Sequence, residues 1–94
     1  MRTVTASIDD VWDRIVRHAG TLFMTVTGIE FRYHAANRYI RLNHTYRNIS
    51  KSDFQKALSH VPFSGTTMVN RLSVQGPSYV YSILMDRRIR RGDW

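Results

Sequence analysis

The 94-residue sequence contains no cysteine and no long apolar run. The absence of cysteine excludes a disulfide framework, a thiolate metal site and thiol catalysis. A membrane-spanning helix needs about 20 consecutive apolar residues, and no segment approaches that length. The first residues also lack the apolar stretch of a secretory signal. We therefore expect a cytoplasmic protein that does not bind a membrane.

The signatures of common catalytic and cofactor sites are also missing. None of the four histidines forms a His-x-x-x-His or Glu-x-x-His pair, which is the spacing that zinc and di-iron sites use. The sequence has no P-loop, no dinucleotide-binding glycine pattern and no Gly-x-Ser-x-Gly nucleophile motif. These absences predict a protein without a metal, a cofactor or catalytic residues.

Acidic residues and lysines are scarce, whereas arginine is abundant. Seven acidic residues stand against fourteen basic ones, for a net charge of +7, and twelve of the fourteen are arginine. Residues 1–30 hold three basic and four acidic side chains, whereas residues 31–94 hold eleven basic and three acidic. Arginine presents a planar fork that fits phosphate. A basic excess confined to one part of the chain predicts a polyanion binder, although the charge could equally serve only solubility.

The length and hydropathy pattern predict one α+β domain over residues 1–94, beginning with a helix. Ser7 is a suitable N-cap, and Asp10 occupies the matching capping-box position. Apolar side chains then recur at helical spacing, at Ile8, Val11, Trp12, Ile15 and Ala19.

Alternating apolar residues after this helix predict a three-stranded antiparallel β-meander. The predicted strands span residues 21–26, 29–35 and 38–43. If Thr27-Gly28 and Ala36-Asn37 are two-residue turns, one face collects the apolar side chains of all three strands and faces the core. That predicted core face contains Leu22, Met24, Val26, Ile29, Phe31, Tyr33, Ile40 and Leu42.

Two or three helices are predicted after the meander. A capping box at Ser50 and Asp53 begins the second helix, and Pro62 ends it. Residues 63–75 fit a short helix and a strand equally well. The Gly-Pro start at Pro77 favours a helix over a strand in the next segment. The arginine-rich residues 87–94 have the composition of a basic C-terminal tail.

The same register places a polar and aromatic set on the opposite face of the meander. This set contains Phe23, Arg32, His34, Tyr39 and Arg41, with Arg32 directly across from Arg41. Like charges opposed on a sheet destabilise it, so a bound anion would make this arrangement favourable. Aromatic rings among cations can stack the bases of single strands, and a β-ribbon can enter the major groove of duplex DNA. Alternatively, Phe23 and Arg32 form a cation–π pair, or the C-terminal segment covers this face.

These patterns predict a non-catalytic module that binds DNA or RNA. The predicted contact residues are Phe23, Arg32, His34, Tyr39, Arg41, Arg47, Lys51, Arg87, Arg88, Arg90 and Arg91. One alternative is a protein-interaction subunit that docks an acidic partner or self-associates as a homodimer. Another is a small metal-independent ribonuclease that uses His34, Tyr39, Arg32 and Arg41. The element order over residues 8–61 resembles a double-stranded-RNA-binding domain, but only Lys51 and Lys56 remain of that family's lysine cluster.

Overall fold

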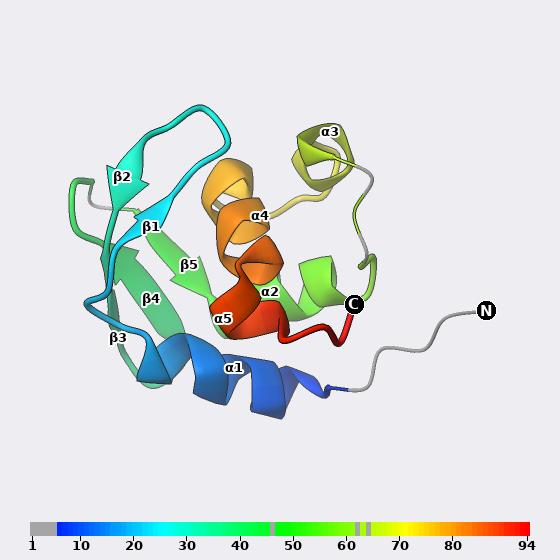
Figure 1. Cartoon of the computed structure of the whole chain (residues 1–94), viewed down its shortest axis with the longest axis horizontal. Coiled ribbons are helices and arrows are strands. Elements are labelled where there is room, and N and C mark those ends of the chain that lie inside the picture. The colour runs from blue at the N-terminus through cyan, green and yellow to red at the C-terminus, as the bar shows by residue number, and fades with distance from the viewer. Residues whose placement is uncertain (1–5, 46, 62, 64) are drawn as a thin grey trace.

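The predicted fold class is confirmed by the computed structural model of the chain, which describes residues 6–45, 47–61, 63 and 65–94. An N-terminal helix, a three-stranded antiparallel sheet and several helices occur in the expected order (Figure 1). The elements are α1 (Ile8–Arg17), β1 (Phe23–Met24), β2 (Glu30–Phe31), β3 (Tyr33–Ala35), β4 (Tyr39–Leu42), β5 (Asn48–Ser50), α2 (Lys51–Leu58), α3 (Thr66–Asn70), α4 (Pro77–Met85) and α5 (Arg87–Arg90).

The helices begin where local signals in the sequence place them. Ser7 caps α1 and Ser50 caps α2, each in a complete capping box with the aspartate three residues later. Pro77 occupies the start of α4, so the helical interpretation of this segment is confirmed. Residues 66–70 form α3, which resolves the open choice in that region in favour of a helix. Pro62, predicted to end α2, lies outside the described residues. No described helix is long and apolar enough to cross a membrane.

The strands form two small sheets rather than one. β1 pairs with β2, and the second sheet has the order β3-β4-β5 with all neighbours antiparallel. Figure 1 shows both sheets at one end of the molecule, with α2, α4 and α5 on their inner side. The core between these layers contains the fully or almost fully buried side chains of Tyr33, Ile40, Leu42, Ile49, Phe54, Ile83 and Leu84.

The predicted register of the first hairpin is wrong by one residue. Phe23 pairs with Phe31, and Thr25 accepts and donates bonds opposite Ile29. The loop therefore contains three residues, 26–28, with Gly28 in the left-handed conformation at φ 89°. A three-residue hairpin loop with a left-handed glycine is common, and the additional loop residue turns every side chain of β1 over. Leu22, Met24 and Val26 are consequently exposed.

The second hairpin differs from the prediction by two residues, so its faces are preserved. Ala36 bonds to Tyr39, which leaves Asn37 and Arg38 as the two-residue turn. His34 therefore lies across from Arg41, and the predicted Arg32–Arg41 pair does not occur. Strand β5 was not predicted.

The segment predicted to be a basic tail is a folded part of the core. Its residues form α5, and both Ile89 and Trp94 are fully buried. Arg14 of α1 fastens the segment by a 2.6 Å ion pair to Asp93 and a 2.8 Å hydrogen bond to the Ile89 carbonyl. With four arginines in five residues, the segment has a strongly polar composition. The sequence therefore did not indicate that Ile89 and Trp94 are buried.

Candidate functional site

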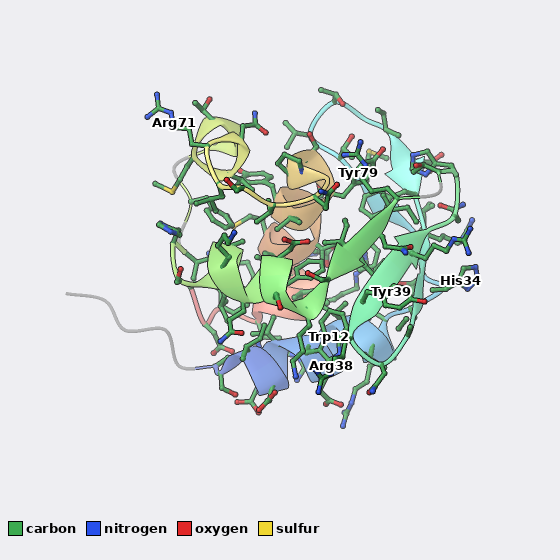
Figure 2. The ribbon with its side chains drawn as sticks, turned by 180° about the vertical axis from the view of Figure 1, so that it is seen from behind. Trp12, His34, Arg38, Tyr39, Arg71 and Tyr79 are labelled. Carbon is green, nitrogen blue, oxygen red and sulfur yellow. The ribbon has the colours of Figure 1, made fainter. Side chains whose placement is uncertain are left out.

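The side of the β3-β4-β5 sheet that faces away from the helices is the main polar surface of the fold. We call this surface the outer face and define it by the exposed residues Arg32, His34, Tyr39, Arg41, Asn43 and Asn48. His34, Arg41 and Asn48 form one row across the three strands. Tyr39, of which 41% is exposed, lies two residues before Arg41 on β4. In Figure 2, His34 projects from the edge of the sheet, whereas Arg38 lies beside Trp12, near α1.

The bend between β2 and β3 positions Arg32 at one end of this face. The backbone N–H of Arg32 donates to the Asn43 side-chain oxygen at 2.8 Å, and the N–H of Asn43 donates to the Arg32 carbonyl at 2.9 Å. These reciprocal bonds join the two strand ends. The exposed Arg38, in the tight turn between β3 and β4, instead lines a separate pocket with Asp9 and Lys51, at the starts of α1 and α2.

Arg32 of the outer face takes no part in the ion pairs between described residues. Those pairs include Arg14 with Asp93, Arg17 with Asp13, Lys51 with Asp9 and Arg88 with Asp86. Every cation in these pairs comes from α1, α2 or α5. Arg32, Arg38 and Arg47 form no ion pair with another described residue. Their charges therefore remain available to an anionic ligand.

A pocket of about 570 Å³ opens beside the row of His34 and Arg41. Its lining consists of His34, Arg41, Leu42, Asn43, His44 and Thr45. His44 is held between two partners, because its Nε2 lies 2.9 Å from the Tyr79 hydroxyl and its Nδ1 lies 3.4 Å from the Asn43 oxygen. Tyr79 belongs to α4 and packs edge-on against Phe31. One wall of the pocket is thereby attached to the helical layer.

Phe23 was predicted to lie on the ligand-binding face, and this prediction is wrong. Only 2% of the side chain is exposed, because the first hairpin has the other register. The ring packs against Phe31 and Tyr33, and the Arg88 guanidinium lies 4.1 Å from its centroid. Phe23 is therefore a core residue. The predicted partner for a cation–π contact, Arg32, is replaced by Arg88.

Some of the other predicted contact residues already bond to groups within the protein, and others are exposed elsewhere. Arg88 bonds to Asp86 and to the Leu22 carbonyl, Arg90 donates to the Trp94 carbonyl, and Lys51 pairs with Asp9 at 2.7 Å. Arg87 and Arg91 are exposed and border a separate pocket with Trp94. These residues do not converge with the outer face.

Residues of the site that were absent from the predicted set include Asn43, His44, Thr45 and Asn48. Asn48 was missed because strand β5, which carries it, was not recognised. Only pairing with β4 reveals that Asn48 lies beside Arg41. The residues proposed for RNA cleavage lie on one face, with His34 and Arg41 as cross-strand partners. Among the described residues, no group of three or more His, Asp or Glu side chains could hold a metal ion.

Comparison with known proteins gives no match, since no family model fits the chain and no curated protein or solved structure is significantly similar to it. Interpretation of the site therefore depends on its own geometry and charge.

Proposed function

We propose that the protein binds nucleic acid through the outer face, without catalysing a reaction. The observation that carries this proposal is the outer face itself, on which the exposed side chains of His34, Tyr39 and Arg41 lie with Arg32, a cation that forms no ion pair with another described residue. Cations without internal partners can neutralise phosphates and release the counterions that surround a nucleic acid. Arginine suits this role because its fork contacts two phosphate oxygens at once.

Tyr39 extends the proposal from phosphate to the bases. Its ring is 41% exposed on the same face as the arginines, and no aromatic partner for it occurs among the described residues. An exposed ring beside cations is the arrangement that proteins use to stack bases, and each stacked base contributes about 1–3 kcal/mol. Electrostatic contacts alone would not require an aromatic side chain here.

Fluorescence anisotropy with labelled oligonucleotides across a salt series tests the proposal. The logarithm of the affinity should fall linearly with the logarithm of the salt concentration, with a slope of about −0.7 to −0.9 per phosphate neutralised. Arg32→Ala should weaken binding and reduce the magnitude of the slope by about 1. Absence of salt-dependent binding by the unmodified protein would overturn the proposal.

Arg17→Ala provides a matched control. It removes the same charge from α1, where Arg17 pairs with Asp13 at 2.9 Å away from the outer face. The slope should not change in this variant. Recovery of intact RNA from the same samples would separate binding from cleavage, whereas cleavage that disappears in His34→Ala would support the ribonuclease alternative.

The β1-β2 hairpin supports a second role, self-association. Leu22, Met24, Val26 and Ile29 are all exposed, and no basic residue occurs between positions 22 and 30. Two copies could meet through this apolar surface without bringing basic side chains of the hairpin together, and a shared patch of this kind forms a symmetric contact. Light scattering on a concentration series should detect a dimer, and Val26→Asp should reduce it. A monomer at all concentrations would exclude this role.

A further inference from the structure

We infer that the pocket beside His34 and Arg41 receives an unstacked base, so that the protein binds single-stranded nucleic acid in preference to duplex. This inference rests on the proposed function and adds the class of ligand. In a duplex, each base is paired and stacked between neighbours, so its faces are inaccessible to a pocket. The bases of a single strand can leave the stack and enter one.

The dimensions and lining of the pocket suit a base rather than a phosphate alone. A volume of about 570 Å³ lies within the range of roughly 300–1,000 Å³ that small-molecule sites occupy. Apart from the buried Leu42, the lining residues are His34, Arg41, Asn43, His44 and Thr45. Histidine rings and arginine guanidinium planes are surfaces on which unstacked bases lie, and polar side chains bond to the edges of those bases.

Hydrogen bonds within the protein determine which polar group of the Asn43 side chain, the oxygen or the NH₂, is available to a ligand. Its side-chain oxygen accepts the backbone N–H of Arg32, so the amide cannot be turned over without losing that bond. The same oxygen can only accept a hydrogen bond, so His44 donates to it from Nδ1, while its Nε2 lies 2.9 Å from the Tyr79 hydroxyl. The Asn43 NH₂ group makes no hydrogen bond with another described residue. It therefore remains as an oriented donor for the acceptor atoms of a base.

Tyr39 lies at a suitable place to hold the neighbouring base. Tyr39 and Arg41 are two residues apart on β4 and project from the same face, which separates them by about 7 Å. His34 stands across from Arg41 and borders the pocket. A strand that follows the outer face could thus stack one base on Tyr39 and insert the next into the pocket, while the arginines contact its phosphates.

The first test compares single strands with a duplex of equal length at one salt concentration. Labelled single-stranded RNA, single-stranded DNA and duplex DNA oligonucleotides would be titrated by anisotropy. One inserted and one stacked base should make at least one single strand roughly tenfold tighter than the duplex, despite its lower charge density. The RNA and DNA arms show which backbone the pocket accepts.

A pair of charge-matched variants then assigns the preference to the pocket. Asn43→Asp keeps a side-chain oxygen for the Arg32 N–H but removes the NH₂ donor. Asn48→Asp adds the same negative charge to the same face, at a residue that does not line the pocket. Both should weaken binding overall, but only Asn43→Asp should reduce the ratio of single-strand to duplex affinity toward 1. Circular dichroism would confirm that both variants are folded.

The outcomes distinguish this inference from the proposed function. Equal, salt-dependent affinity for single strands and duplex would overturn the pocket's role and leave nucleic-acid binding intact. An equal decrease of the ratio of single-strand to duplex affinity in Asn43→Asp and Asn48→Asp would also overturn the pocket's role. No binding to any oligonucleotide would overturn both proposals.

Discussion

The two small sheets of this protein present opposite chemistry to solvent. The β1-β2 hairpin exposes apolar side chains, with 56% of Met24 and 69% of Val26 accessible. The β3-β4-β5 sheet exposes histidine, tyrosine, asparagine and arginine while burying Ile40 and Ile49. Both sheets bury aromatic or branched side chains in the same core. The two sheets differ in whether the apolar or the polar set of alternating side chains faces solvent.

This contrast shows that hydropathy alternation does not by itself decide which face of a strand is buried. In β1, both sets could serve as a core face, since one contains Leu22, Met24 and Val26 and the other contains Phe23. The ring of Phe23 has three partners in Phe31, Tyr33 and Arg88, whereas Thr25 satisfies its hydroxyl within the loop. An aromatic ring buries more apolar area than methionine or valine, so Phe23 determines the register.

The largest expected effect is a difference in stability between substitutions on the two faces of β1. Phe23→Ala should lower the free energy of unfolding by about 3–5 kcal/mol, because it leaves a cavity among buried rings. Met24→Ala, one residue later on the exposed face, should change it by less than about 0.5 kcal/mol. Urea denaturation followed by circular dichroism measures both. Similar losses in the two variants would contradict the register described here.

A smaller effect tests how the hairpin is attached to the helices. Arg88 donates to the Leu22 carbonyl at 2.9 Å, covers the Phe23 ring and pairs with Asp86. Because this side chain is partly exposed, Arg88→Ala should cost about 1–2 kcal/mol, less than a buried charge-assisted contact would. Arg87→Ala is the matched control, since Arg87 is exposed and forms no ion pair with a described residue. Equal stability of the two variants would show that Arg88 does not hold the hairpin.

Alkaline pH should weaken the anchor of the larger sheet. The Tyr33 hydroxyl donates to the Ile15 carbonyl at 2.5 Å, and burial raises the pKa of this phenol. The unfolded phenol ionises near pH 10 while the folded one stays neutral, so stability should fall as pH rises above about 10, by up to about 1.4 kcal/mol per unit. Urea denaturation from pH 9 to 11 measures the slope. Tyr33→Phe should remove this contribution, and an unchanged slope would contradict it.

Acidic pH should have the smallest effect on stability. It should act through the contact between Asp86 and Arg88, which attaches the hairpin. Hydrogen bonds from the Arg88 side chain hold the pKa of the Asp86 carboxyl below its usual range. A carboxyl with a lowered folded pKa stabilises the fold above its unfolded pKa, and that contribution disappears as pH falls through the folded value. For a partly exposed pair, the loss should be about 1 kcal/mol or less. Measuring how the free energy of unfolding falls at acidic pH in Asp86→Asn and in the unmodified protein checks this, because the variant should lack this contribution.

Sequence reasoning located most of the candidate site although its register was wrong. The second hairpin is displaced by two residues, and because side chains alternate with a period of two, His34, Tyr39 and Arg41 kept their predicted face. The first hairpin is displaced by one, so Phe23 was assigned to the wrong face. Asn48 was missed because the pairing of β5 depends on contacts between segments.

The sequence by itself determined the helix starts and the charge. Capping boxes at Ser7 and Ser50 and the Pro77 start act within one helical turn, so the local residues suffice to specify them. Only the tertiary structure decided which arginines stay available to a ligand. Arg14, Arg88 and Arg90 find carboxylate or carbonyl partners because α5 folds onto α1 and the hairpin, and no local pattern encodes that packing.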